Sequence, residues 1–254
     1  MIWGAECRRT LRSARVLALL GLYCLFALLV FVMAAAVRSF AQQLIQSGML
    51  VSNEEMPVSV LGVFYLSLFF LPIYVALMGF DQVSGEVGPR SIRYLTVRAR
   101  RSSVLLGKFL AQTTVLLGLV FLLDLGLCVY AWVTTPGFGI AAFGFNVLRF
   151  WMASTVFSLA FLALTSLCSS VTPSSAVSLI LNFSVLLVSF LLWTTALLDP
   201  GHPLRYVRYL SPLRYSLKLI HLEPLAVAGG VAAYVVFTLL FLGGAFFVLR
   251  ERDL

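Results

Sequence analysis

The stretch GFDQVSGEVGPRSIRYLTVRARRSSVLLGK, residues 79–108, lies between two apolar runs that are each long enough to cross a bilayer. It carries six of the eighteen basic residues of the chain. Charge that is concentrated between two membrane spans can meet only a headgroup surface or a partner in the adjacent water. We therefore expect this connector to be the working part of the chain.

The composition defines the class of protein. Of the 254 residues, 61% are hydrophobic and 11% are charged, whereas an ordinary globular domain is about 45–50% apolar. A transmembrane helix needs roughly 20 predominantly apolar residues, and its backbone satisfies its own polar groups in the hydrocarbon. The runs are continuously apolar, unlike the alternating strands of a membrane barrel. The sequence thus predicts an all-α integral membrane protein, residues 1–254 forming one domain with six spans at 16–37, 58–80, 104–133, 147–168, 174–198 and 225–249.

The distribution of Lys and Arg predicts the orientation of these spans. Six helices place both termini on the side of the connector, and that side collects twelve basic residues against six on the other. Because cytoplasmic loops are enriched in Lys and Arg, both termini are expected in the cytoplasm of a multi-pass protein of the plasma (inner) membrane. The basic residues of the outer loop 199–223 are evidence against this orientation.

Two amphipathic helices are expected on the cytoplasmic surface. Residues 1–15 place Trp3, Cys7, Leu11 and Ala14 on one face and arginines on the other, as in a helix that lies in the interface. In the connector, which we delimit as 81–103, an apolar stripe faces a fan of arginines from Arg90 onwards. The second helix could serve as a topology signal and lipid anchor, or it could dock a partner.

Two further features carry polar chemistry. Asp124 lies within the third span, where a carboxylate costs at least about 2.5 kcal/mol unless it is paired or wet. It is expected either to line a pathway or dimer seam, or to form a helix–helix hydrogen bond. In the outer loop 199–223, Leu213, Leu217 and Ile220 are spaced as on a half-buried helix, which either re-enters the membrane or covers the helix ends as a lid.

Metal and disulfide chemistry are not indicated. His202 and His221 are nineteen residues apart and have no Cys or acid at ligand spacing. The four cysteines at positions 7, 24, 128 and 168 form no close pair. The expectation is therefore no metal site and cysteines that act as small apolar packing residues.

The connector and the outer loop together resemble a known family. The segments Ser84-Gly85-Glu86, 91–95 and 101–108, and later the Ser-Pro at Ser211-Pro212, are similar to the motifs of the type 2 ABC transporter permeases. Two positions depart from the usual pattern, because Arg90-Ser91 stands where a Gly-Thr is common and Ala99 where a Pro is common. The resemblance covers essentially the whole chain.

The resemblance implies a transmembrane permease subunit that exports a substrate with energy from ATP hydrolysed elsewhere. It places a short coupling helix in the connector, received by an ABC ATPase (nucleotide-binding) subunit that would hold the ATP and Mg2+. It also implies a second permease copy or a paralogue facing this one, and no nucleic acid partner. The implied contacts with the ATPase are Ser84, Glu86, Arg90, Ile92, Arg93, Leu95 and Arg98, and the implied outer gate is Pro212, Arg214 and Tyr215.

The residues themselves agree with a separate ATPase. The sequence has no Gly-x-x-x-x-Gly-Lys-Ser/Thr phosphate loop, since Gly107-Lys108 is followed by Phe109. No cofactor is therefore expected on this chain, and it is not expected to be an enzyme. The alternatives are a membrane-embedded enzyme, for which no catalytic set assembles, and an ion-coupled secondary carrier, which would favour an internal repeat with several midplane polar groups.

Overall fold

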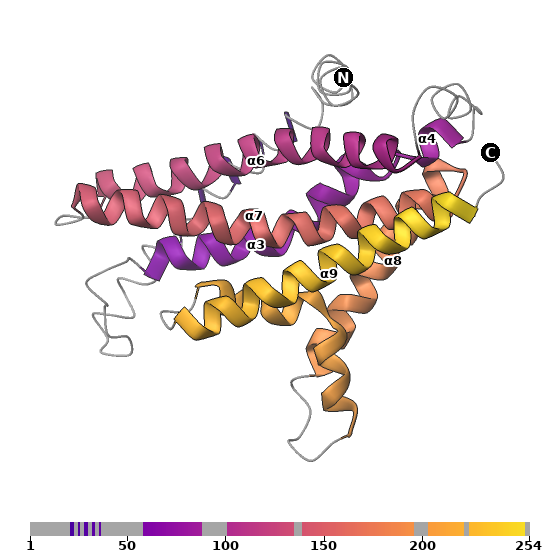
Figure 1. The fold of residues 1–254 in the computed structure, drawn as a ribbon. Coiled ribbons are helices and arrows are strands. Elements are labelled where there is room, and N and C mark those ends of the chain that lie inside the picture. Colours follow the sequence, from indigo (N-terminus) through magenta and orange to yellow (C-terminus); the bar gives the residue numbers. More distant parts are fainter. Residues whose placement is uncertain are drawn as a thin grey trace.

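A computed structural model describes residues 21–22, 25, 28–29, 32–33, 36, 58–87, 101–134, 139–195, 203–220 and 224–251 of the chain (Figure 1). These residues form helices and their connections, with no β-strand among them. The helices in chain order are α3 (Val58–Gly79), α4 (Ser84–Val87), α6 (Arg101–Thr134), α7 (Ile140–Val171), α8 (Ser175–Thr194), the 3-10 helices η2 (Pro203–Leu210) and η3 (Pro212–Ile220), and α9 (Pro224–Glu251).

Five of the described helices, α3, α6, α7, α8 and α9, are long and apolar enough to span a membrane. They correspond to the predicted runs, although α7 begins seven residues before the predicted 147, α6 begins three residues before the predicted 104 and α8 ends four residues before the predicted 198. The predicted first span, 16–37, is described at eight positions, all of them helical. The predicted interfacial helix at 1–15 and the residues 88–100 of the connector lie outside the described part. The all-α, multi-pass prediction is confirmed for the described helices.

The helix α7 is the centre of the bundle. It packs against α3, α6, α8, α9 and η3, and Figure 1 shows it between α6 and α9. Small side chains let neighbouring backbones approach closely in a membrane bundle. Aromatic pairs fill the space between them: the rings of Phe64 and Phe150 are stacked with their centres 4.2 Å apart, and those of Phe157 and Tyr234 meet edge to face at 5.6 Å. The buried small residues of α7 are Ala153, Ser154, Ser158, Ala160, Ala163, Ser166, Ser169 and Ser170.

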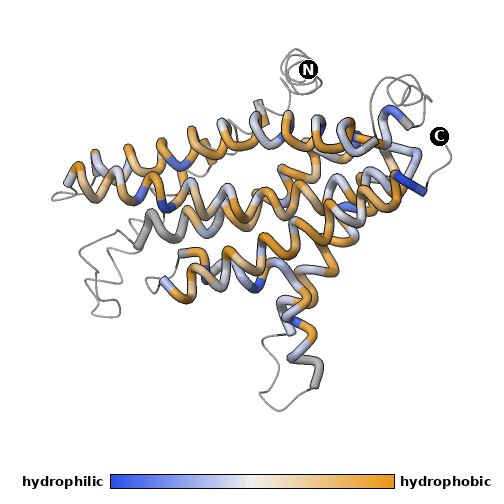
Figure 2. Tube along the Cα trace, viewed as in Figure 1, coloured by the Kyte–Doolittle hydropathy of each residue, from blue (hydrophilic) through white to orange (hydrophobic). Residues whose placement is uncertain are grey.

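One end of the bundle collects both ends of the connector and the end of α9. Val83, Leu105, Ala245 and Leu249 form a small buried cluster there. Figure 2 shows hydrophobic residues along most of the long helices and hydrophilic ones at α4 and at the end of α9. The end of α9 and the connector therefore lie on the same side of the bundle. We call this the connector end.

Candidate functional site

A set of polar side chains is buried at the connector end, where α3, α4, α6, α7 and α8 meet. Buried polar groups are costly unless they are hydrogen-bonded, so a concentration of them marks a place where position is specified. We call this set the inner polar cluster. Its members are Gln82, Ser84, Glu86, Lys108, Ser166, Ser169 and Ser178, and all of them are less than 9% exposed.

Ser169 of α7 holds the start of α4. Its Oγ accepts hydrogen bonds from the backbone N–H groups of Val83, at 2.9 Å, and Ser84, at 3.0 Å. The first N–H groups of a helix have no partner within the helix, and a side-chain oxygen that accepts from them acts as a cap. Here the cap is supplied by another helix, 85 residues away in sequence. The short helix α4 is thereby tied to α7.

The carbonyl group of Phe80 and the side chain of Gln82 extend this connection. The Oγ of Ser84 donates to the Phe80 carbonyl at 3.0 Å, and the Oγ of Ser178, on α8, donates to it at 2.6 Å. The hydroxyl of Ser166 donates to Oε1 of Gln82 at 2.9 Å. The turn after α3 is consequently bonded to both α7 and α8.

An ion pair joins the two helices on either side of residues 88–100. The Lys108 Nζ lies 2.8 Å from Oε1 of Glu86, and the two side chains are only 8% and 9% exposed. Glu86 belongs to α4, which precedes residues 88–100, and Lys108 belongs to α6, which follows them. The pair therefore closes the loop at its base. We refer to it as the connector clamp.

The structure places the predicted coupling residues in two groups. Ser84 and Glu86 are buried within the chain, at 1% and 7% exposure, and bond to other helices rather than facing outward. Arg90, Ile92, Arg93, Leu95 and Arg98 lie outside the described residues. Contact with an ATPase stays a prediction for both groups. The serines of α7 and α8 were missed, although the run 164–175, rich in Ser and Thr, was a signal in the sequence.

Asp124 lies deep between α6 and α7 and is 0% exposed. Ser154 of α7 is the polar side chain that interacts with it, but the geometry falls short of a hydrogen bond for both carboxylate oxygens among the described residues. Cys128, one turn along α6, is equally buried. Burial inside a single chain favours an internal role for Asp124 over a seam between two copies. Its part in a pathway stays a prediction.

The predicted outer gate lies in η3, which together with η2 we call the outer cap. The expected helix is present between Pro212 and Ile220, but it is a 3-10 helix. Its residues therefore align every third position, and buried Leu219 shares a face with Leu213. The helix that the spacing of Leu213, Leu217 and Ile220 predicted is therefore present, with about three residues per turn instead of the 3.6 of an α-helix.

The residues of the predicted outer gate are engaged within the outer cap and with the bundle. Tyr234 of α9 donates from its hydroxyl to the Pro212 carbonyl at 2.7 Å, and Tyr215 donates to the Tyr209 carbonyl at 3.2 Å. The guanidinium carbon of Arg214 lies 3.4 Å from the centre of the Tyr209 ring. The nearby guanidinium groups, first of Arg208 and then of Arg214, hold the pKa of the Tyr209 hydroxyl below its usual value of 10. The gating role of Pro212, Arg214 and Tyr215 stays a prediction.

Replacing Tyr234 with phenylalanine should destabilise the protein by about 1–3 kcal/mol, because the buried Pro212 carbonyl loses its donor. Thermal unfolding in detergent micelles would measure the loss. The matched control is Tyr206→Phe, which removes the same hydroxyl from a residue that is 71% exposed and should change little. Equal stability of both variants would show that the Tyr234 bond does not hold the outer cap on α9.

No group of three or more His, Cys, Asp or Glu in the described part of the chain could hold a metal ion. His202 and His221 fall outside that part. Cys128 and Cys168 are buried free thiols. Within the described residues we therefore find no metal or redox centre beside the inner polar cluster and the outer cap.

The geometry defines a multi-pass α-helical membrane protein with buried polar contacts at the connector end and an outer cap at the other end of α9. Residues 1–254 match the family model described as ABC-2 family transporter protein, and the chain belongs to that family. Such proteins are membrane subunits, typically without catalytic activity, and generally pair with ABC ATPase subunits. No curated protein matches the chain well enough to count as a relative.

Proposed function

We propose that this membrane subunit exports its substrate and that residues 88–100 receive the motion of a separate ATPase subunit. The observation that carries the proposal is the connector clamp. The Glu86–Lys108 pair fixes the base of the loop at 2.8 Å, and Ser169 fixes α4 to the central helix. A loop held at both ends transmits a displacement to the helices instead of absorbing it.

The described contacts suggest where that displacement goes. From the clamp it reaches α6 through Lys108, and α7 and α8 through Ser169 and Ser178. A shift of α6 against α7 would change the spacing between Asp124 and Ser154, which face each other across these two helices. We propose that Asp124 is the polar element of the pathway that senses the shift. The outer cap, bonded to α9 through Tyr234, would then close or open the outer exit.

The proposal includes the arrangement of the complex. The connector and both termini lie in the cytoplasm of the plasma (inner) membrane, as the twelve-to-six distribution of basic residues favours. The ATPase holds the ATP and Mg2+, and a second permease copy or a paralogue completes the pathway. Symmetric pairs are the commonest oligomers, which favours two identical copies.

The experiment introduces a negative charge at two of the predicted contact positions in the connector. Arg93→Glu and Leu95→Asp should each lower transport-coupled ATP hydrolysis about tenfold or more in the complex with its ATPase, because like charges or a buried carboxylate at an interface cost several kcal/mol. Membrane insertion should be unchanged. The measurement is ATP hydrolysis and substrate export by the reconstituted complex, together with the yield of inserted protein.

Matched changes within the same connector provide the controls. Arg100→Glu makes the same charge change, and Val97→Asp introduces the same carboxylate away from the apolar stripe of Ile92 and Leu95. Both controls should leave coupling within about twofold of the wild type, because neither Arg100 nor Val97 is among the predicted contacts with the ATPase. If all four variants couple normally, the connector is only a topology signal and the proposal is wrong.

A further inference from the structure

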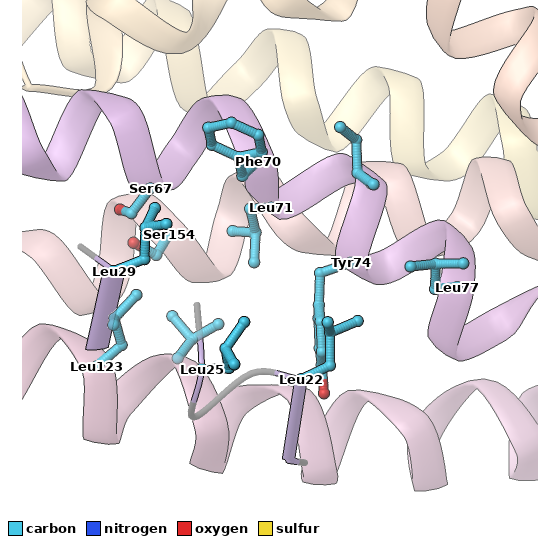
Figure 3. Close-up of a pocket in the computed structure, with 12 residues that line it drawn as sticks. Leu22, Leu25, Leu29, Ser67, Phe70, Leu71, Tyr74, Leu77, Leu123 and Ser154 are labelled. Carbon is cyan, nitrogen blue, oxygen red and sulfur yellow. The ribbon is translucent and has the colours of Figure 1, made fainter. Parts of the chain in front are cut away.

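A cavity of about 290 Å3 lies between the described part of the first predicted span, α3 and α6 (Figure 3). Its volume is about ten times the roughly 30 Å3 that one water molecule occupies in the liquid. It is too small to admit a helix, whose diameter with side chains is about 10–12 Å. The residues of α3 that line it run from Ser67 to Leu77, which corresponds to about 15 Å along the helix axis. The cavity is therefore long and narrow.

Its walls are almost entirely apolar. Leu25 and Leu29 come from the first predicted span, Leu71 from α3, and Val120 and Leu123 from α6. Figure 3 shows Leu25, Leu71 and Leu123 around one space. A water molecule in such a space needs two to four polar partners, and the hydroxyl groups on the lining are few. An apolar guest suits this cavity better than water.

The few hydroxyl-bearing residues on the lining have neighbours of their own within the chain. The Ser67 hydroxyl donates to the carbonyl of Phe64 at 2.7 Å. Ser154 interacts with Asp124, which lies behind it between α6 and α7. Tyr74 also has a partner. The cavity consequently has little hydrogen-bonding capacity left for a polar guest.

The cavity can be reached from the surrounding membrane. The residues that the first predicted span contributes to the lining also face the surroundings of the bundle, since Leu22, Leu25 and Leu29 are 44%, 64% and 47% exposed. These residues lie on a helix whose sequence is long and apolar enough to span the bilayer, so the medium outside them is hydrocarbon. Any guest that enters by this side comes from the lipid phase.

We infer that the cavity binds one acyl chain of a bilayer phospholipid. The narrow shape, the apolar walls and the opening toward hydrocarbon all match a single saturated or unsaturated chain, whereas a folded peptide or a second helix would not fit. When it is bound there, the acyl chain completes the packing between the first predicted span and the α3–α6 pair. The inference concerns lipid binding and does not depend on the proposed route of coupling.

The experiment measures phospholipid that stays with the purified protein. Wild-type protein, washed extensively in detergent, should retain about one phospholipid per chain, as expected for a pocket of ligand size. Leu25→Trp fills the cavity from the first predicted span, and Val120→Phe fills it from α6. Both variants should lose most of the retained phospholipid, which is quantified by mass spectrometry of the extracted lipids.

Each filling variant has a matched control on its own helix. Leu28→Trp and Val129→Phe make the same changes at exposed positions, 66% and 42% respectively, that do not line the cavity. Both should retain lipid as the wild type does. If Val120→Phe fails to fold, Leu25→Trp still decides the question, because Leu25 is 64% exposed and the larger side chain enters the cavity from its edge without having to be accommodated in the core.

Three results would overturn the inference. They are a wild-type protein that retains no phospholipid, filling variants that retain as much as their controls, and a retained amphiphile that is not a phospholipid. The last result would identify the tail of a transported cargo, which ATP turnover in the complex should release, whereas a resident phospholipid should stay. Added phospholipid should also raise the melting temperature of the stripped wild type but not of Leu25→Trp.

Discussion

Replacing Lys108 with methionine should destabilise the protein by about 3–5 kcal/mol, because removing one partner of a buried ion pair leaves the other charge uncompensated. Glu86 would keep its carboxylate in a site that is 9% exposed, without the ammonium group that lies 2.8 Å away. The free energy of unfolding, measured by denaturation in mixed micelles, would show the loss. This is the largest single effect expected of any side chain in the inner polar cluster.

The double variant Glu86→Met with Lys108→Met separates charge from packing. Well-packed apolar residues in place of a buried ion pair are often neutral or stabilising, so the double variant should recover most of the lost stability. Lys218→Met is the control for the substitution itself, since Lys218 is exposed on η3 and should lose no more than about 0.5 kcal/mol. If the double variant is as unstable as Lys108→Met, the ion pair is not the source of the effect.

The same double variant tests the proposed function. It would restore a folded protein whose connector ends touch only through apolar side chains. If the connector clamp transmits motion, this protein should insert and bind its ATPase but export less substrate per ATP hydrolysed. If export per ATP is unchanged in a stable double variant, the clamp serves folding alone.

Introducing a methyl group at Gly79 should destabilise the protein by about 1–3 kcal/mol, the usual cost of overpacking a core. A Cβ atom there would lie 2.7 Å from Cγ2 of Thr165 and 3.2 Å from Oε1 of Gln112. The methyl group of Thr165 belongs to a β-branched side chain with little freedom to turn away. Gly79→Ala should therefore force α3 away from α7 just before the inner polar cluster, with a lower melting temperature as the readout.

Two further variants make the Gly79 result specific. Gly118→Ala adds the same methyl group to α6 where nothing lies within 4 Å, so it should be neutral or stabilising by up to about 1 kcal/mol. Thr165→Ser removes the obstructing Cγ2 atom and should rescue Gly79→Ala, whereas Thr165→Val keeps a methyl group and should not. A Gly79→Ala protein as stable as Gly118→Ala would contradict the close approach of α3 and α7.

The spans could be predicted because each one carries its own signal. A long apolar run must become a helix in hydrocarbon whatever its neighbours do, and α3, α6, α8 and α9 follow their runs closely. The start of α7 was less predictable, because the polar Asn146 separates the short apolar stretch 140–145 from the predicted run that begins at 147. Local hydropathy indicates whether a segment lies in hydrocarbon or in water, but it does not define the residue at which a helix begins or ends.

The inner polar cluster could not be predicted because it depends on contacts between distant segments. Ser169 caps α4 across 85 residues, and Lys108 meets Glu86 across 22. The Ser- and Thr-rich run 164–175 indicates polar residues near the end of α7, but the partner of each serine is known only when the helices are packed. Glu86 was recognised from the family pattern as a functional position, but the pattern did not reveal that its side chain points to Lys108.

The helix α6 is long enough to extend beyond the hydrocarbon core into the headgroup layer. Its 34 residues extend about 51 Å, while the hydrocarbon core is about 30 Å thick. Even the steepest usual tilt, about 40°, would shorten its projection only to about 39 Å, so some 9 Å must stand outside the hydrocarbon. The part that stands out at the connector end carries the beginning of α6 into the layer of phosphates and bound water. A force applied to this end of α6 acts on a stiff helix, and the other end of that helix lies on the opposite face of the membrane.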